Sequence, residues 1–263
     1  MSSAQSDLES CRSMLKHLGW SWAADQLHEL LEQAVSEDRS FASFLQLIAQ
    51  QEHDRREERR ITNWLKRSGL PRGQTLENFD FTFAQGVDKA KIDLLATCEF
   101  IAKRETALLL GPSGTGKSHL AAALGVKAIQ NGFPTYFIEA DDLIEMLRRD
   151  DDRPRHQVRR RRYMTSTLLI IDEFGFQPLD QADAHRLFRL IHDRHERAST
   201  IITSNKSVRQ WPGLLAEDEL LATALLDRLL HHCHLLQIDG PSYRLRHLQD
   251  TFETGQAAAA PHE

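Results

Sequence analysis

The sequence has little cysteine and no long apolar run. Its 263 residues contain three cysteines, Cys11, Cys98 and Cys233, which are odd in number and lie far apart. This usage is typical of reduced thiols and argues against a disulfide framework. No apolar run approaches the roughly 20 residues that a membrane span needs, and the start MSSAQSDLES has no basic stretch followed by an apolar one. We therefore expect a soluble, cytoplasmic protein that does not associate with a membrane.

A strong excess of charge of one sign is also missing. The 33 Lys and Arg residues stand against 38 Asp and Glu residues, which gives a formal net charge of −5. This balance argues against indiscriminate nucleic-acid binding by the whole surface. It leaves local basic patches open, because the positions of the cations decide phosphate binding. The hydrophobic share of 41% is enough for a core, and the length allows one large domain and one small one.

Residues 1–68 repeat apolar side chains at helical spacing and predict a small all-helical N-terminal domain for contact with a partner or DNA. Ser40 is a candidate N-cap for a helix whose middle, EHDRREERR, is polar on every side. Glycine and proline residues then break the helical pattern, so we interpret residues 69–83 as the linker between domains.

Residues 84–250 alternate between apolar runs and helical patterns, which predicts a five-stranded parallel sheet covered by helices on both faces. The expected strands are Ala107–Leu110, Thr135–Ile138, Leu168–Asp172, Thr200–Thr203 and Leu235–Ile238. The expected helices are Lys117–Asn131, Asp141–Arg149, Ala182–Arg197 and Glu217–His232. Little chain follows the fifth strand, so we expect no C-terminal helical lid, and we expect the Ala-rich residues 251–263 to form a disordered tail.

The strongest motif is GPSGTGKS, which fits the phosphate-binding pattern G-x-x-x-x-G-K-[ST] between an expected strand and an expected helix. Glycines let the backbone wrap closely around phosphate oxygens, and the helix N-terminus favours an anion. Lys117 is expected to reach the β- and γ-phosphates of ATP, and the Ser118 hydroxyl to bind Mg²⁺. The predicted nucleotide-binding residues of this loop are Gly111, Pro112, Ser113, Gly114, Thr115, Gly116, Lys117, Ser118 and His119.

Two further strands are followed by polar side chains that suit hydrolysis. In LLIIDEF, Asp172 follows four apolar residues and is expected to hold the Mg²⁺ shell, while Glu173 is expected to deprotonate the attacking water. In STIITSN, Asn205 ends a buried strand, where its amide could hold the same water. The plainer alternatives are an acidic pair that caps an ordinary strand and an asparagine in a turn.

A basic segment, RRDDDRPRHQVRRRRYM, lies between the second and third expected strands. The guanidinium group of arginine can bind a phosphate through two parallel hydrogen bonds, so this segment is a candidate DNA-binding surface. We expect it to contact the phosphate backbone and not the base edges, with Tyr163 as a nearby aromatic ring. The alternative is a solvated loop that Asp150–Asp152 partly neutralise. The candidate DNA-binding residues are Arg155, Arg159, Arg160, Arg161 and Arg162.

With these motifs in order, the sequence resembles the IstB/DnaC branch of the AAA+ P-loop ATPases, and more closely the IstB-like helpers encoded beside the transposase of bacterial insertion sequences. The resemblance spans most of residues 14–246. Two departures are DEFGF, where DELGY is expected, and a denser set of arginines in RPRHQVRRRRY. The matching stretches are MLKHLGWSWAADQLHELLEQA, TLENFDF, LLLGPSGTGKSHLAAALG, LLIIDEFGFQPLD, RHERASTIITSN and ALLDRLLHHCHLLQIDGPSYRLR.

The resemblance implies two more site residues. Arg228 in LLDRLL matches an arginine finger that reaches the γ-phosphate of a neighbouring subunit, and Arg244 in SYRL matches a sensor arginine for the subunit's own nucleotide. Without the resemblance, Arg228 could form a surface ion pair and Arg244 could be a solvated charge. The implied cofactors are ATP and Mg²⁺, and the implied partners are a homo-oligomer assembled with ATP, duplex DNA bound with little sequence preference, and the cognate transposase.

Three functions remain open from the sequence. The first is a transposition helper that assembles on duplex DNA, remodels it and delivers it to the transposase. The second is a replicative helicase loader of the DnaC type, which would share the catalytic residues and differ in the partner of its N-terminal domain. The third is a metabolic P-loop kinase, which would leave Asn205 and Arg228 without a role.

Overall fold

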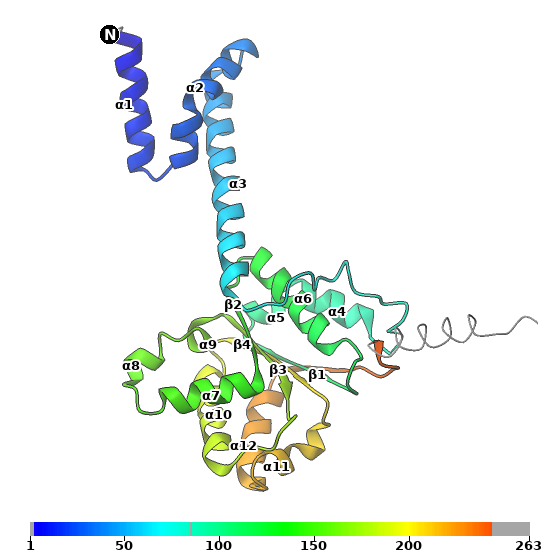
Figure 1. Cartoon of the computed structure of the whole chain (residues 1–263). Helices are drawn as coiled ribbons and strands as arrows, with labels where there is room; N and C mark the ends of the chain where they lie inside the picture. Colours follow the sequence, from blue (N-terminus) through cyan, green and yellow to red (C-terminus); the bar gives the residue numbers. More distant parts are fainter. Residues whose placement is uncertain (1–2, 85, 244–263) are drawn as a thin grey trace, which may run out of the picture. The chain divides into compact units, whose positions relative to one another are not determined.

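The computed structural model describes residues 3–84 and 86–243 (Figure 1). The chain divides into two compact units, Met1–Asn63 and Trp64–Glu263, which are treated separately below. The predicted sensor arginine Arg244 and the predicted tail 251–263 lie outside the described residues. Within the described part of the chain, no helix combines the length and the apolarity that crossing a membrane requires.

The N-terminal unit is helical. It contains α1 (Ser3–His17), α2 (Ser21–Ser36) and most of α3 (Phe41–Arg67). Its small core is formed by Ala23, Leu27, Leu30 and Ile48, with tryptophan and leucine side chains packed around them. Ser40 Oγ accepts a hydrogen bond from Ser43 N at 3.2 Å, so the predicted N-cap of α3 is confirmed.

The second unit is built on a parallel sheet with the strand order β2-β3-β4-β1-β5. All five predicted strands are present to within two residues at each end. β4 lies between β1 and β3, which brings the ends of three motif-bearing strands together. The strands are β1 (Thr106–Leu110), β2 (Thr135–Glu139), β3 (Leu168–Phe174), β4 (Ser199–Ser204) and β5 (Cys233–Gln237).

Helices cover both faces of this sheet, as predicted (Figure 1). Side chains alternate along β1, so that Ala107 and Leu109 enter one apolar layer and Leu108 and Leu110 enter the other. The first layer includes α4 (Lys89–Ala96), α5 (Glu99–Ala102) and α6 (Lys117–Gln130). The second includes α7 (Ala140–Asp150), α10 (Gln181–Arg194), α11 (Trp211–Leu214) and α12 (Glu219–Leu230). Short helices α8 (Arg155–Val158), α9 (Arg162–Thr165) and η1 (Val208–Gln210) lie in the connections.

The segment 69–83, which the sequence suggested as a linker, packs on the sheet unit. Leu70, Leu76, Phe79 and Phe81 lie against the first apolar layer. The segment is tied further by Lys127, whose Nζ donates to Glu77 Oε1 at 2.7 Å and lowers the pKa of that carboxyl to about 2. Glycine and proline do end the helical pattern here, but the apolar residues between them gain burial by folding back on the core. The segment therefore forms part of the wall of the candidate site.

Candidate functional site

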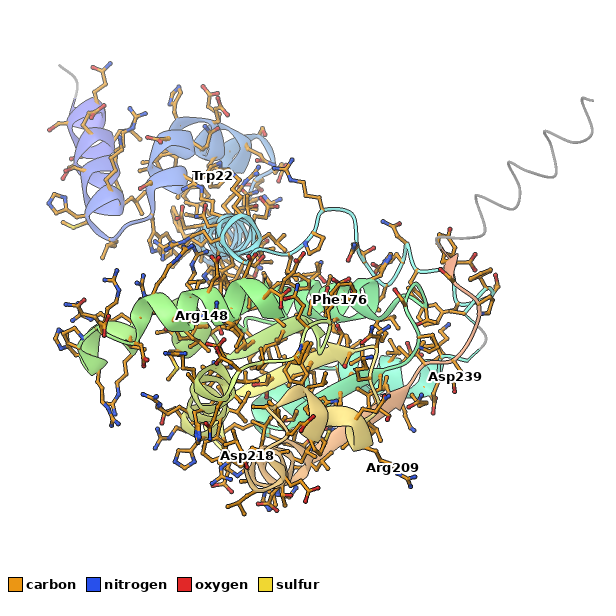
Figure 2. All side chains as sticks on the ribbon, turned by 60° about the horizontal axis from the view of Figure 1, so that its bottom comes forward. Trp22, Arg148, Phe176, Arg209, Asp218 and Asp239 are labelled. Atoms are coloured by element: carbon orange, nitrogen blue, oxygen red, sulfur yellow. The ribbon has the colours of Figure 1, made fainter. Side chains whose placement is uncertain are left out.

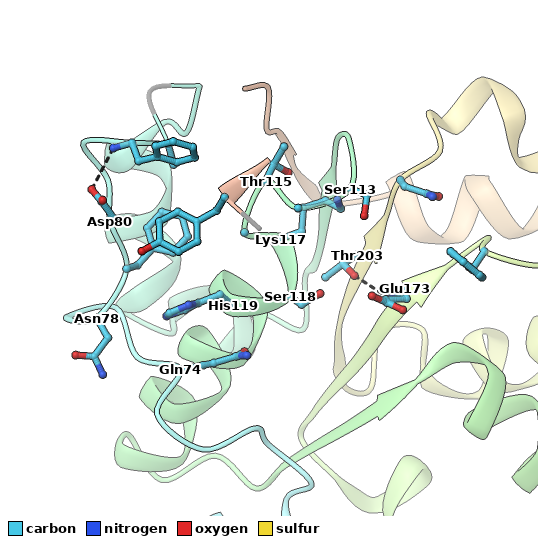
Figure 3. Close-up of a pocket in the computed structure, with 18 residues that line it drawn as sticks. Gln74, Asn78, Asp80, Ser113, Thr115, Lys117, Ser118, His119, Glu173 and Thr203 are labelled. Atoms are coloured by element: carbon cyan, nitrogen blue, oxygen red, sulfur yellow. Dashed lines mark hydrogen bonds between the residues drawn. The ribbon is translucent and has the colours of Figure 1, made fainter. Parts of the chain in front are cut away.

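A pocket of about 510 Å³ opens where β1, β3 and β4 end (Figure 3). Its wall comes from the glycine-rich loop after β1, the ends of β3 and β4, the segment 74–84 and Tyr243. Ligands of open α/β sheets collect at the carboxyl ends of the strands, because loops and helix N-termini converge there. This pocket is therefore the candidate functional site.

The glycine-rich loop runs from β1 into α6 with a backbone that only glycine adopts easily. Gly114 and Gly116 have φ angles of +80° and +92°. A Cβ atom at Gly114 would lie 2.0 Å from Ser242 Oγ, and one at Gly116 would lie 2.6 Å from Phe79 Cε2. The loop can thus curl tightly before α6, whose N-terminal N–H groups carry the positive end of the helix dipole. This geometry suits a bound phosphate.

The side chains of the loop complete an anion site. Lys117 is buried, and its Nζ donates to the carbonyl oxygen of Pro112 at 2.6 Å. Thr115 Oγ1 donates to the same oxygen at 2.9 Å. Ser113 to His119 all line the pocket, whereas Gly111 joins the loop to the sheet by donating from its N–H to Ser204 O at 3.2 Å. Most of the predicted phosphate-binding residues therefore lie together on one wall.

The phosphate-binding loop and the start of α6 also contact the segment 74–84. His119 Nε2 lies at hydrogen-bond distance, 2.9 Å, from Thr75 O, and its ring meets the ring of Phe79 edge to face at 5.3 Å between centroids. Phe83 packs edge to face on Tyr243 at 5.2 Å. Aromatic rings and the polar groups of Gln74, Asn78 and Asp80 thus form the part of the pocket that lies away from Lys117 (Figure 3).

The carboxylates lie on a bulge at the end of β3. Ile171 pairs with Ile202 and Phe174 pairs with Ser204, so that Asp172 and Glu173 together face one residue of β4. Glu173 has a φ angle of +56°, which is unusual for a residue with a side chain. Bulges of this kind re-aim side chains near active sites. Glu173 is exposed and lines the pocket, while Asp172 is buried behind it.

Sequence reasoning missed Thr203, the residue of β4 that faces this bulge. Its hydroxyl donates to Asp172 Oδ1. The same oxygen accepts a hydrogen bond from Glu173 N at 3.0 Å (Figure 3). Thr203 is buried at 1% exposure and also lines the pocket. No local signal could have singled it out, because four of the six residues of β4 carry a hydroxyl group.

Negative charge accumulates at the ends of β2 and β3. Burial raises the pKa of Glu139, and the charges of Glu173, Asp142 and Asp172 raise it further. A cation would relieve this repulsion. The hydroxyl of Ser118 and these carboxylates are hard oxygen donors of the kind that Mg²⁺ prefers, so the residues present fit a magnesium ion.

Asn205 follows β4 and lines the same pocket as Lys117, Ser118 and Glu173. Its position follows from the strand order, because β4 lies between the phosphate loop on β1 and the carboxylates on β3. The structure thus brings these four predicted site residues together, although they are far apart in the sequence.

Arg228 is on α12 and, among the described residues, is not part of the pocket wall. Its Nε donates to His192 Nδ1 at 3.2 Å, its Nη1 donates to Ala224 O at 2.7 Å, and its guanidinium lies 4.8 Å from the centroid of Phe188. The structure therefore separates Arg228 from the phosphate loop of its own chain.

The arginine-rich segment is partly folded into the core. Asp150 is buried and accepts hydrogen bonds from Arg161 Nη2 and, at 2.9 Å, from Tyr163 Oη. Burial acts to raise the pKa of Asp150, but these bonds outweigh it and lower the pKa. Tyr163 is fully buried, so its predicted place beside a DNA surface is wrong: its ring gains more by burial in the second apolar layer.

The five candidate DNA-binding arginines divide into two groups. Arg161 pairs with Asp150, and Arg162 bonds Arg67 O and lies 5.1 Å from the centroid of Tyr136. Arg155, Arg159 and Arg160 are exposed, and no side-chain partner is recorded for them among the described residues. Arg162 is exposed as well, so within the described part of the chain the three differ from it in having no recorded side-chain contact.

A buried arginine fixes the start of β3. Arg194 of α10 is 2% exposed, and its guanidinium donates to Tyr163 O at 2.9 Å, Ser166 O at 3.0 Å and Ser199 O at 2.7 Å. Burial lowers its pKa to about 10. The connection from α9 into β3 is thereby fastened to α10 and β4.

The sheet order and the glycine loop before α6 place the second unit in the AAA+ class of P-loop NTPases. Solved structures share this fold. The crystal structure of DnaI matches with a TM-score of 0.54 at 19% identity, covering 65% of this chain and 95% of that one. AMPPCP-bound DnaA from Aquifex aeolicus matches with a TM-score of 0.52 at 20% identity, covering 71% of this chain and 56% of that one.

Within this class, the chain belongs to the family of IstB-like ATP binding proteins, whose family model matches residues 13–251. It is 43% identical to the putative ATP-binding protein of insertion sequence IS5376 from Geobacillus stearothermophilus, over 85% of this chain and 88% of that protein. It is 41% identical to the corresponding IS21 protein from Pseudomonas aeruginosa, over 91% and 89% of the two chains. The predicted family and fold class are confirmed. The chain is therefore an ATP-binding protein of the family that insertion sequences encode.

Proposed function

We propose that this protein is a cytoplasmic ATP-dependent transposition helper, which assembles on duplex DNA, remodels it and delivers it to the transposase. The proposal rests above all on one observation: the pocket gathers Lys117, Glu173 and Asn205, while Arg228 lies apart on α12. Such a site is complete only when a second copy supplies the arginine. The names of the insertion-sequence relatives support the link to transposition.

The residues of the pocket have separate roles in hydrolysis. The loop N–H groups and Lys117 hold the triphosphate. Ser118 and the Asp172 carboxylate would hold the shell of a Mg²⁺ ion, which when bound would supply positive charge to the site. Glu173 takes a proton from water, whose oxygen attacks the γ-phosphorus as the bond to the ADP oxygen breaks. Asn205 orients that water. The aromatic wall of segment 74–84 receives the base.

The role of Arg228 is to stabilise charge in the transition state of a neighbouring subunit. A trans-acting arginine of this kind is worth about 10³-fold or more in rate. ATP then controls assembly, because one copy grips the triphosphate and the next copy completes the site. Hydrolysis resets the assembly.

A mixing experiment tests this arrangement. Arg228→Ala keeps an intact pocket, and Glu173→Gln binds ATP, stays assembled on duplex DNA and keeps an intact Arg228. Each variant alone should hydrolyse ATP slowly, and the mixture should recover activity because pocket and arginine then come from different subunits. The control mixture of Lys117→Ala with Glu173→Gln contains no intact pocket and should stay inactive. A mixture no faster than the sum of its parts contradicts a site shared between subunits.

DNA binding is assigned to the exposed arginines of the segment, Arg155, Arg159 and Arg160. Replacing all three by glutamine should lower duplex affinity and reduce the slope of log affinity against log salt by about 2 to 3, because each phosphate contact contributes about 0.9. Replacing the exposed Arg72, Arg197 and Arg209 removes the same charge elsewhere and should leave the slope nearly unchanged. Of these three, Arg209 is labelled in Figure 2. Equal slopes for the two triple variants contradict the assignment.

A helicase loader is the alternative within the same fold, since it would use the same pocket. The two functions differ in the partner, so capture of the transposase encoded next to the gene, against capture of a replicative helicase, separates them. ATP turnover that is independent of DNA at low protein concentration would instead favour a small-molecule kinase.

A further inference from the structure

Thr203 occupies a position that neither the motifs nor the family comparison assigns to the reaction. The bulge in β3 sets two residues, Asp172 and Glu173, against Thr203 alone. The side chain of Thr203 is buried at 1% exposure, and its hydroxyl contacts both of these residues. It therefore lies at the one point of the sheet where the two carboxylate residues can be held together.

The hydroxyl both donates and accepts a hydrogen bond in these contacts. Its proton goes to Asp172 Oδ1, and a lone pair accepts the Glu173 N–H at 3.0 Å. The first bond fixes the orientation of the Asp172 carboxylate. The second holds the backbone of Glu173 at a φ angle of +56°, a conformation that costs a residue with a side chain about 1–2 kcal/mol. Without this bond, a partly buried N–H would also lose its partner.

The next residue fixes the other end of the bulge. Ser204 Oγ donates to Phe174 O at 2.6 Å and accepts from Lys206 N at 3.1 Å. Ser204 is buried like Thr203, but no bond is recorded from its side chain to Asp172 or Glu173 in the described structure. The Ser204 hydroxyl thus supports the backbone after the bulge, whereas the Thr203 hydroxyl supports the two carboxylate residues.

We propose that Thr203 is a positioning residue for ATP hydrolysis: one hydroxyl sets both the carboxylate that holds the Mg²⁺ shell and the direction of the glutamate that deprotonates water. This inference rests on the proposed function. It predicts an effect on kcat rather than on nucleotide binding, because the phosphate loop is built from other residues. If Thr203 only filled space, its replacement would not lower kcat while leaving nucleotide binding unchanged.

The test compares variants that differ by an oxygen atom. Thr203→Val keeps the shape and removes the hydroxyl, and kcat should fall about 10²-fold, as expected when a catalytic group is displaced by about 1 Å. KM and the affinity for a fluorescent ATP analogue should stay close to wild type. Thr203→Ser restores the hydroxyl and should recover most of kcat. Ser204→Ala is the matched control, because it removes a neighbouring buried hydroxyl and should reduce kcat much less.

A second pair guards against misfolding of the valine variant. Thr203→Ser and Thr203→Ala both lack the methyl group and differ only in the oxygen, so the serine variant should be the faster of the two. Equal kcat values for this pair, or a valine variant as fast as wild type, overturn the proposal.

Glu173→Gln, measured in the same assay, separates this inference from the proposed function. If Glu173→Gln is inactive and Thr203→Val is not, only the role of Thr203 fails. If Glu173→Gln hydrolyses ATP at the wild-type rate, the proposed role of Glu173 fails as well. In the double variant, Thr203→Val should add little to the loss caused by Glu173→Gln, because the two residues act through one group.

Discussion

Lys117 combines burial with a position at the start of α6, and its ammonium group is held at the loop by the carbonyl oxygen of Pro112. The loop carbonyl keeps the side chain folded over the site instead of extended into solvent. A bound triphosphate therefore meets a cation that is already in place, which lowers the entropy cost of binding.

Replacing this residue should weaken nucleotide binding strongly. In Lys117→Ala, ATP affinity should fall about 10²-fold, because a charged hydrogen bond to phosphate is worth roughly 1.5–3 kcal/mol. Equilibrium binding of a fluorescent analogue measures the affinity, and sedimentation with ATP measures assembly, which should be lost. Lys103→Ala removes an exposed lysine that pairs with Glu99 and serves as the control. Wild-type affinity in Lys117→Ala would contradict the assigned site.

The contrast between Lys117 and Thr203 explains how far the site could be predicted. The phosphate loop is local, since its glycines, lysine and serine occupy eight consecutive positions, and the motif alone locates it. The role of Thr203 depends on a bulge in another strand, 31 residues from its partner Asp172. The register of two parallel strands is set by the whole sheet, so no local pattern reveals it. Tyr163 was misjudged for the same reason, because its partner Asp150 lies on a different helix.

At the scale of elements, α7 and α10 are joined by a buried carboxylate. Asp183 is 1% exposed and accepts hydrogen bonds from Arg148 Nε at 2.9 Å and Arg186 Nη1 at 2.8 Å. The bond from Arg148 lowers the pKa of Asp183, against the effect of burial, and Arg186 lowers it further. The ion pair between Arg148 and Asp183 therefore links α7 to α10. The helix α10 also carries His192 and Arg194.

This carboxylate makes stability depend on pH. Its folded-state pKa lies below the unfolded value of about 4, so its contribution is present above that pH and is lost as pH falls through the folded-state pKa. Asp183→Asn should destabilise the protein by about 1–2 kcal/mol at pH 7, because it removes charged hydrogen bonds whose arginine partners are partly screened by solvent. Denaturant titrations should show this difference shrinking below about pH 4. Asp193→Asn, an exposed site on α10, is the control, and a difference that persists unchanged at low pH contradicts the assignment.

The elements differ in how well the sequence predicts them. The five strands were found because buried parallel strands appear as continuous apolar runs. The helices α4 and α5, of eight and four residues, were not predicted. Such short helices gain most of their stability from packing, in this case of Ile92, Leu95, Phe100 and Ile101 in the first apolar layer. The segment 69–83 was interpreted as a linker because glycine and proline signal a break but do not say where the chain goes next.

At the scale of the whole molecule, the proposed function predicts that activity depends on assembly, because Arg228 lies apart from the pocket of its own chain. ATP turnover per molecule should rise with protein concentration and with added duplex DNA, and it should fall by about 10³-fold when the protein is dispersed. Steady-state phosphate release over a dilution series measures this, and Arg228→Ala should stay low throughout. Turnover per molecule that is constant on dilution to a monomer would contradict a site completed by a neighbour.

The strand β3 has a further mechanical consequence. It starts at the connection that Arg194 fastens, directly after the segment with the three exposed arginines, and it ends at the bulge that carries Glu173. A paired strand hardly stretches, because each residue already spans about 3.3 Å. If the arginine segment binds DNA as proposed, a pull on that segment would therefore be transmitted along β3 to the bulge that carries Glu173.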